Sequence, residues 1–332
     1  MQPKKASITT LAKATGLSSA TVSRALAGAS SVLPATRDKV LQAAREQHYV
    51  RDRAAVRLKT GKAHTLAFIM DRQDVSQPGF KDFLMGLGDA LQDTDYHLIV
   101  LPQRTGETTL DSVKYVIDRG LADGLVLTYT AQQDARVRYL QDICFPFITY
   151  GRTQLPAHDS VDFANETFAD MAVAKLVTQN RKRLGILLPT AGASFYQHLC
   201  DGFMQACLRL GVAGECISAV CLDDPPSTLY QWAHDHAVAF DGLVVTREAP
   251  MLPLLSAFSD GGVQVGQRID LVLKYSSPLP QYIRQPLWAC FEDMHHAGHS
   301  LGVHMLARFS HPGQAMVQEL FLPHLETIHA TS

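Results

Sequence analysis

The stretch GLSSATVSRAL, residues 16–26, combines hydroxyl side chains and one arginine with no carboxylate. Its serines and threonine could exchange hydrogen bonds with base edges, and Arg24 could reach guanine or phosphate. Small side chains also allow a helix to lie deep in a major groove, where the Ala20 methyl could contact thymine. The chemistry open to this stretch is therefore contact with double-stranded DNA.

Two short helices must hold these groups in place. Apolar residues recur at helical spacing on both sides of Gly16, where the first helix must end and turn. Ser18 is a natural N-cap for the second helix, whose first turns then expose the polar side chains. The spacing predicts a helix-turn-helix. Its candidate DNA-binding residues are Thr9, Ser18, Ser19, Ala20, Thr21, Ser23 and Arg24.

A third helix is expected over residues 34–47. Pro34 is tolerated in the first turn of a helix, and the spacing of Val40, Leu41 and Ala44 predicts an inward face. These side chains would close a small core over the other two helices. A plain three-helix bundle is the alternative, and it leaves the exposed hydroxyl-rich helix unexplained.

The charge of the chain is divided unevenly along its length. Residues 1–62 contain 12 Lys and Arg against 3 Asp and Glu, whereas the whole chain has a formal net charge of −2. This asymmetry is typical of a small module that meets a polyanion, joined to a larger acidic body. A length of 332 residues also exceeds what one hydrophobic core usually organises, so we expect two or three domains.

Residues 53–58 read as a short basic helix with few apolar side chains to bury, which is marginal in isolation. Leu58 lies between Arg57 and Lys59, which fits a helix that forms on DNA and wedges its leucine into a minor-groove step. Arg53 and Leu58 are therefore further candidate DNA contacts. The alternative is an exposed linker whose leucine packs on the next domain.

From residue 65 onward, strand and helix patterns alternate, and the rhythm restarts after Asp162. Repeated β-α units imply parallel sheets, and two successive sets imply two doubly wound lobes in an α/β body. The expected strands are 65–70, 97–102, 124–129, 145–151, 183–189, 216–222, 241–246 and 269–275, and the expected helices are 79–92, 109–121, 165–179, 195–211 and 226–237.

Ligands of such folds bind beyond the carboxyl ends of the strands, in the crevice between lobes. Polar loop residues after the strands would line that crevice and suit a hydroxyl-rich molecule, although each alone could be a solvated loop residue. The candidates are Asp71, Arg72, Gln73, Tyr129, Arg152, Tyr196, Gln197, His198, Arg247, Glu248, Lys274 and Ser276.

Sequence motifs typical of enzymes and cofactors are lacking. There is no GxSxG, P-loop or HExxH motif, and GLGDAL at residues 86–91 falls in a helix pattern rather than in a dinucleotide turn. His295 and His299 have the spacing of helical metal ligands but no clear third partner, so a solvated helix face is preferred over a metal site. Asp223 and Asp224 read as a loop and helix cap. No catalytic residue, metal or cofactor is expected.

The six cysteines form no CxxC pair and no regular framework, so we expect reduced, mostly buried thiols. No apolar run approaches the roughly 18–20 residues of a membrane span, and the start MQPKKASITT has no signal-peptide core. We expect a cytoplasmic protein without a membrane partner.

Several segments carry a family likeness. ITTLAKATGLSSATVSRALAG, TRDKVLQAAREQHY and AAVRLKTG closely resemble the headpiece and hinge of LacI/GalR-type transcriptional regulators. The resemblance continues in order through QPGFKDFLMGLGDAL, ADGLVLT, FPFITYGR, VDFANETFADMAVAKLV and RKRLGILLP, and so covers nearly the whole chain. The headpiece matches are specific as a set, whereas the body matches indicate mainly a periplasmic-binding-protein-like fold.

The resemblance implies roles for particular residues. Ser19 and Ala20 fall where the family reads bases, Arg24 where it uses an arginine at the operator, and Leu58 where it levers the minor groove. Phe80 fits the aromatic residue placed against the ligand at the cleft mouth, with a core contact of its own helix as the alternative.

Three departures from the family pattern affect the crevice. Leu199 stands where the family often has an arginine that clamps the effector, and Arg247 and Glu248 stand where it often has Asn-Asp. Residues 274–277, Lys-Tyr-Ser-Ser, replace a frequent Gly-Tyr-Asp-Asp. We expect His198, Arg247 and Lys274 to take over from the missing clamp.

The resemblance implies a repressor of carbohydrate-utilisation genes, acting as a homodimer on a palindromic operator and controlled by a sugar or glucoside, in a sub-branch linked to glucoside regulation. It also implies a three-helix headpiece at 1–50, a hinge at 51–62, one lobe at 63–163 plus about 292–320, and a second at 164–291 plus about 321–332. The C-terminal segment LPHLETIHATS is too short for a tetramer-forming heptad repeat. The alternatives are a regulator with a non-sugar effector or none, and a sugar-converting enzyme with a DNA tether.

Overall fold

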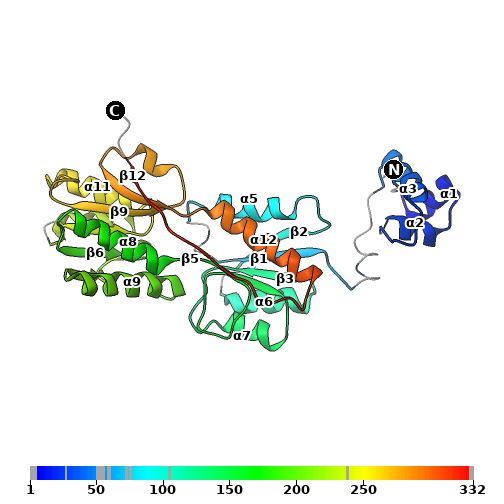
Figure 1. Cartoon of the computed structure of the whole chain (residues 1–332), viewed down its shortest axis with the longest axis horizontal. Coiled ribbons are helices and arrows are strands. Elements are labelled where there is room, and N and C mark those ends of the chain that lie inside the picture. Colours follow the sequence, from blue (N-terminus) through cyan, green and yellow to red (C-terminus); the bar gives the residue numbers. More distant parts are fainter. Residues whose placement is uncertain are drawn as a thin grey trace. The chain divides into compact units, whose positions relative to one another are not determined.

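The computed structural model describes residues 6–26, 28–49, 57, 61–71, 74, 77–103, 106–236 and 239–328. It divides into two compact units, Met1–Ala63 and His64–Ser332 (Figure 1). The candidates Arg53, Leu58, Arg72 and Gln73 lie outside the described residues.

The first unit contains three helices, α1 (Ile8–Thr15), α2 (Ser19–Leu26) and α3 (Pro34–Glu46). α1 ends at Gly16, whose φ of 67° is left-handed, a backbone conformation that costs glycine nothing. Ser18 caps α2 as expected, because its Oγ accepts from the Thr21 N–H at 3.1 Å. The predicted helix-turn-helix is therefore present, with local hydrogen bonds fixing the turn.

Leu11, Val22 and Val40, one from each helix, form the centre of the core of this unit and are fully buried. The prediction that Leu41 faces inward is wrong, because its side chain is 39% exposed. Ala43 is buried in its place, since a residue three positions after Val40 shares its helix face.

The second unit begins with a six-stranded sheet. All neighbouring strands are parallel, in the order β11-β5-β4-β3-β1-β2. Its strands are β1 (Thr65–Met70), β2 (His97–Pro102), β3 (Gly124–Leu127), β4 (Phe147–Tyr150), β5 (Ser160–Phe163) and β11 (Gln318–Phe321). Two cores cover its two faces, one with α5 (Phe80–Leu91) and α12 (Met294–Ser310), the other with α6 (Thr109–Asp118) and α7 (Ala135–Asp142).

A second six-stranded sheet follows, in the order β12-β10-β9-β8-β6-β7, parallel except where β12 joins β10. Its strands are β6 (Arg183–Leu187), β7 (Ala213–Cys216), β8 (Gly242–Val245), β9 (Asp270–Tyr275), β10 (Leu287–Phe291) and β12 (Leu325–Ile328). α8 (Asn165–Thr178) and α9 (Ser194–Leu210) pack on one face, and α10 (Pro226–His236) and α11 (Met251–Asp260) on the other, with a short 3-10 helix η2 (Leu279–Tyr282). The α/β body with two doubly wound lobes is confirmed.

The chain passes between the lobes three times, after β5, after β10 and after β11 (Figure 1). The second crossing returns α12 to the first lobe, where it lies along α5. Their contact needs glycine: a Cβ at Gly298 would lie 2.1 Å from the Phe83 carbonyl oxygen, and one at Gly86 would lie 2.0 Å from that of His295. These glycines therefore fix how closely the two helices approach.

Two other expectations fail in the second lobe. The strand expected over 216–222 occupies Ala213–Cys216 instead, and the apolar Ile217, Val220 and Leu222 are buried in the core outside any strand. The expectation of reduced thiols is contradicted for Cys200 and Cys216, which form a disulfide with a Cα–Cα distance of 6.1 Å. The shifted strand places Cys216 beside α9, which sequence spacing could not reveal.

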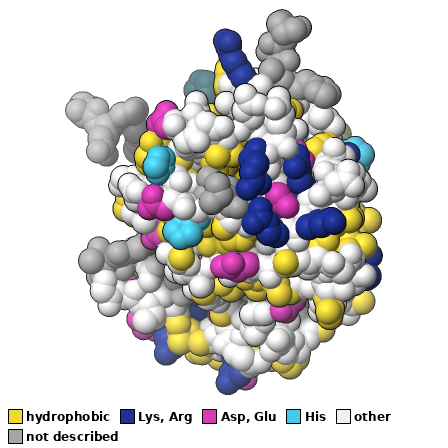
Figure 2. Space-filling model, turned by 90° about the vertical axis from the view of Figure 1, so that its left-hand side faces the viewer, with side chains coloured by type: hydrophobic (Ala, Val, Ile, Leu, Met, Phe, Trp, Pro, Cys, Tyr) yellow, Lys and Arg dark blue, Asp and Glu magenta, His cyan; other side chains and the backbone are white. Residues whose placement is uncertain are grey.

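The two ends of the second sheet differ in character. Basic residues Arg181, Lys182 and Arg183 cluster where the chain enters β6, and Arg181 Nε lies 2.6 Å from Asp270 Oδ2. Figure 2 shows Lys and Arg side chains gathered on this side of the second unit. The opposite, carboxyl ends of the strands face the first lobe and carry the polar cavity described next.

Candidate functional site

The helix-turn-helix presents its polar groups on α2. Ser18, Ser19, Ala20 and Arg24 are exposed, as is Thr9 on α1, while Thr21 and Ser23 are half-buried. Apart from the cap, the Ser18 and Thr21 hydroxyls share a hydrogen bond of 2.8 Å. The exposed face of α2 is thus narrow, small and positively charged, which suits a major groove.

A cavity of about 90 Å³ lies between the two lobes, at the carboxyl ends of both sheets. The first lobe contributes aromatic side chains, among them Phe80, Tyr129 and Tyr150. The second lobe contributes mostly polar ones after its strands, together with Phe195 and Leu199 of α9. Aromatic walls with convergent polar groups are typical of small-molecule sites.

Six of the thirteen residues predicted for this cleft line the cavity: Phe80, Tyr129, Arg247, Glu248, Lys274 and Ser276. Arg152 and His198 lie beside it in a polar network. Asp71 instead donates its main-chain N–H to Asp74 Oδ2, at 2.7 Å. Tyr196 packs against the core of the second lobe, and Gln197 donates to Asp201 Oδ1 at 2.7 Å, so neither lines the cavity.

Lys274 is the centre of a buried network that joins the lobes. Its Nζ donates to Asn165 Oδ1 at 3.0 Å and lies 3.0 Å from Glu292 Oε2. Tyr150 of the first lobe donates its hydroxyl to the other oxygen of Glu292, at 2.8 Å. Burial and the Glu292 charge hold the pKa of Tyr150 well above its usual range, so this hydroxyl stays a donor.

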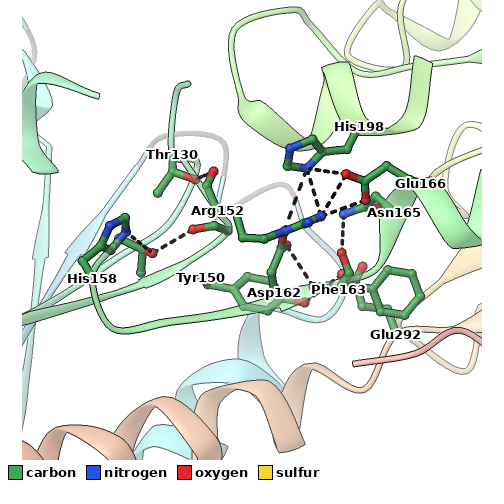
Figure 3. A network of polar contacts seen from close by, with 12 residues as sticks. Thr130, Tyr150, Arg152, His158, Asp162, Phe163, Asn165, Glu166, His198 and Glu292 are labelled. Atoms are coloured by element: carbon green, nitrogen blue, oxygen red, sulfur yellow. Dashed lines mark hydrogen bonds and ion pairs between the residues drawn. The ribbon is translucent and has the colours of Figure 1, made fainter. Parts of the chain in front are cut away.

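Arg152 makes a second connection between the lobes (Figure 3). It leaves the end of β4 and places Nε 2.6 Å from Asp162 Oδ2 and Nη2 2.8 Å from Glu166 Oε2 of α8. His198 of α9 completes the cluster, with Nδ1 3.8 Å from Glu166 Oε1. Burial raises the pKa of Asp162 despite the arginine. Burial also opposes ionisation of Glu166, but its own backbone N–H and Arg152 outweigh that effect and lower its pKa.

Other polar groups of the cavity also have hydrogen-bond or ion-pair partners within the protein. Arg247 Nη1 lies 2.5 Å from Asp223 Oδ1, and Gln77 donates to the Tyr129 hydroxyl at 2.5 Å. Asp74 accepts from the Thr128 hydroxyl at 2.9 Å and is 5% exposed. Burial raises the pKa of Asp74 to about 7.

Sequence reasoning missed several lining residues: Asp74, Gln77, Thr128, Tyr150, Asn165 and Glu292. Asp74 and Gln77 follow the candidate Asp71 within a few positions of the sequence, so an extension of the candidates along that stretch would have included them. Glu292 follows β10, a strand that the sequence pattern did not predict, and no local signal marks it.

Among the described residues, no group of three or more His, Cys, Asp or Glu side chains could hold a metal ion. His295 Nε2 lies 2.9 Å from Asp89 Oδ2 of α5, which gives this histidine a structural partner in the α5–α12 contact. No helix in the described part of the chain is long and apolar enough to span a bilayer.

Comparison with known proteins assigns both units. Residues 7–52 match the family described as bacterial regulatory proteins, lacI family, and residues 63–226 match periplasmic binding proteins and sugar binding domain of LacI family. The chain belongs to the lacI family. It is therefore a DNA-binding transcriptional regulator and not an enzyme.

Relatives of this lacI-family chain are regulators as well. The HTH-type transcriptional regulator AglR of Rhizobium meliloti is 26% identical over 94% of this chain and 90% of its own length. RafR of Escherichia coli is 28% identical over 60% of each chain.

Solved structures share the fold. The lac repressor dimer bound to operator and an anti-inducer aligns with a TM-score of 0.79 at 18% identity, over 99% of this chain and 100% of that one. The complex of the regulator CelR with cellobiose aligns with a TM-score of 0.69 at 18% identity, over 97% and 98%.

Proposed function

We propose that this chain is a sequence-specific repressor of carbohydrate-utilisation genes, whose affinity for a palindromic operator changes when a sugar binds between the lobes. The observation that carries the proposal is the polar and aromatic cavity between two lobes in a chain that also presents an exposed helix-turn-helix. Relatives named for sugars support it: one is the maltose regulon regulatory protein MalI of Escherichia coli, 26% identical over 212 residues.

For DNA recognition, we assign Ser19, Ala20 and Arg24 to base edges in the major groove and Thr9, Ser18, Thr21 and Ser23 to the surrounding backbone or bases. We assign Arg53 and Leu58 of the hinge to the minor groove at the operator centre. Residues 1–50 would form the headpiece and 51–62 the hinge. Two copies related by a two-fold axis would read two half-sites, so we propose a homodimer that acts on genomic DNA in the cytoplasm.

For effector binding, we assign the lining residues Phe80, Tyr129, Arg247, Glu248, Lys274 and Ser276 to direct contact with the sugar. Aromatic side chains would pack against its apolar ring faces, and the polar ones would exchange hydrogen bonds with its hydroxyls. Arg152 and His198 would act beside them, through the cluster with Glu166.

The coupling follows from where the two inter-lobe networks lie. A sugar that enters the cavity competes for the groups around Lys274 and lies close to the Arg152–Glu166 contact, so it favours a different relative position of the lobes. The hinges of a dimer would then change spacing, and their marginal helices would form or melt. A coupling free energy of about 1–3 kcal/mol per effector changes operator occupancy roughly 5- to 150-fold.

The test is a binding titration of the purified chain on genomic fragments that flank its own gene, at fixed salt, with and without mono- and disaccharides that include glucosides. A fragment bound at nanomolar concentration and released or tightened by one sugar supports the proposal. Operator affinity unchanged by every sugar at saturation refutes the sugar response.

A second candidate is a regulator that has a non-sugar effector or none. The observation that favours it is that both cations of the cavity already have carboxylate partners, Lys274 in the lining residue Glu292 and Arg247 in Asp223. Calorimetry distinguishes the two candidates. Tight binding of a sugar in the cavity would count against a regulator with a non-sugar effector or none.

A further inference from the structure

Carboxyl side chains outnumber cationic side chains in the lining of the cavity. Its lining contains four carboxyl side chains, those of Asp74, Asp162, Glu248 and Glu292, but only two cationic ones in the described part of the chain, Arg247 and Lys274. A site built to hold an anion requires the reverse balance, with cations or main-chain N–H groups that converge on the ligand.

Both cations are neutralised before any ligand enters. Lys274 Nζ lies 3.0 Å from Glu292 Oε2, and only 9% of its side chain is exposed. Arg247 Nη1 lies 2.5 Å from Asp223 Oδ1, and only 8% of its side chain is exposed. An anionic ligand would have to displace Glu292 or Asp223 from its pair, which leaves that carboxylate without its cation.

Glu248 differs from Asp162 and Glu292 because no described cation pairs with it. Its side chain is 1% exposed, and its Oε1 accepts the main-chain N–H of Ser276 at 3.2 Å. The carboxylate has acceptor capacity beyond this one bond. A hydroxyl group of a ligand could supply the further donor, in a charge-assisted hydrogen bond.

Three tyrosines around the cavity also have raised pKa values. The pKa of each of Tyr129, Tyr150 and Tyr275 is raised, first by burial and then by neighbouring carboxylates. For Tyr275 these include Glu326 and Glu248, and for Tyr129 they include Asp74 and Asp223. Burial is the main cause for each tyrosine, and the carboxylates add to the cost of forming a phenolate there.

We propose that this cavity accepts an uncharged sugar and rejects its phosphorylated counterpart, with Glu248 as the residue that determines this choice. The inference rests on the proposed sugar response and adds the charge of the ligand to it. Neutral hydroxyls donate to the carboxylates while the aromatic walls cover the sugar ring. A phosphate brings negative charge against Glu248, and no unpaired cation among the described lining residues compensates it.

The test uses the full-length chain and matched pairs of ligands: glucose with glucose 6-phosphate, sucrose with sucrose 6-phosphate and trehalose with trehalose 6-phosphate, with maltose and methyl α-glucoside as further neutral probes. Binding is measured by calorimetry at one salt concentration. We expect a neutral sugar to bind, and every phosphorylated sugar to bind at least about tenfold more weakly than that neutral sugar.

The variant Glu248→Gln keeps the shape of the side chain and the acceptor for Ser276 but removes the charge. We expect it to weaken binding of the neutral sugar. We also expect the ratio of the dissociation constant of the phosphorylated sugar to that of the neutral sugar to fall by about tenfold or more. The matched control is Glu215→Gln on the exposed face of β7, which makes the same chemical change away from the cavity and should leave the ratio unchanged.

The outcomes separate the two proposals. A phosphorylated sugar that binds as tightly as the best neutral one overturns the charge selection while the sugar response stands. A neutral preference that Glu248→Gln leaves intact overturns the role of this residue. Binding of neither kind of sugar overturns the proposed sugar response, and the selection with it.

Discussion

Replacement of Lys274 by methionine tests the energetic role of the buried network. Lys274→Met keeps most of the apolar stem but removes the charge that faces Glu292, and it leaves Asn165 Oδ1 without its donor. Loss of one partner of a buried pair costs about 3–5 kcal/mol, because the other charge is left uncompensated. Glu292 is 15% exposed and keeps the Tyr150 hydroxyl, so we expect the lower end, about 3 kcal/mol.

The assay is urea unfolding followed by tryptophan fluorescence. The chain has two tryptophans, Trp232 and Trp288, and both lie in the second unit, so the signal reports the unit that contains the network. We expect the double variant Lys274→Met with Glu292→Gln to recover a large part of the lost free energy of unfolding, because it also removes the uncompensated charge of Glu292. Lys182→Met, at an exposed position, is the matched control and should stay within about 0.5 kcal/mol of the parent.

Two results would refute this reasoning. One is a loss below about 1 kcal/mol for Lys274→Met, which would mean that the pair is solvated in solution. The other is a double variant that is no more stable than Lys274→Met alone, which would mean that the uncompensated charge of Glu292 is not the origin of the loss.

Further predictions concern DNA binding, helix packing and pH. Arg24→Ala should weaken specific operator binding by about 1–3 kcal/mol in a salt-controlled titration. Leu58→Ala should reduce affinity for the operator more than for random DNA, and equal losses on both would count against a minor-groove wedge. Gly298→Ala should destabilise the second unit by about 1–3 kcal/mol or more, because the new Cβ would lie 2.1 Å from a carbonyl oxygen of α5. The control is Gly88→Ala, where the new Cβ meets open space. This variant should stabilise the unit by about 0.5–1 kcal/mol. Folding raises the pKa of Asp74 from 3.8 to about 7. Between these two pH values the folded state keeps a proton that the unfolded state has lost, so the stability of the parent falls as the pH rises from about 4 to about 7. Asp74→Asn should therefore gain stability relative to the parent from pH 4 to pH 7, by up to about 4 kcal/mol, and a constant difference would contradict the assignment.

Local chemistry explains the elements that sequence reasoning placed correctly. The end of α1 at Gly16 and the start of α2 after Ser18 depend on a left-handed residue and a capping hydroxyl within a few positions. The strand at 65–70 is a short apolar run that is buried on both sides. By contrast, the apolar run of Ile217, Val220 and Leu222 is buried without being a strand, because hydrophobicity reports burial and not backbone pairing.

The cavity was predictable in position but only partly in composition. Its place follows from two successive sets of parallel strands, since ligand sites of such folds lie at the carboxyl ends. Tyr196 and Gln197 have side chains that could bind a sugar, but both lie on α9 and point away from the cavity. Tyr196 packs on the core of the second lobe, and Gln197 donates to Asp201. Glu292 reaches the cavity because the chain crosses back to the first lobe after β10, an event without a local signature.

Caps, helical spacing and apolar strands act over a few residues, so the headpiece and the alternating α/β body could be predicted from sequence alone. Which charged side chains pair could be seen only in the folded chain. Asn165 is far from Lys274 and Glu292 in the chain, yet all three meet in one network. Arg152 contacts Glu166 only because the two lobes face each other at this point. Electrostatic pairing depends on distance in space and on burial, and sequence order encodes neither.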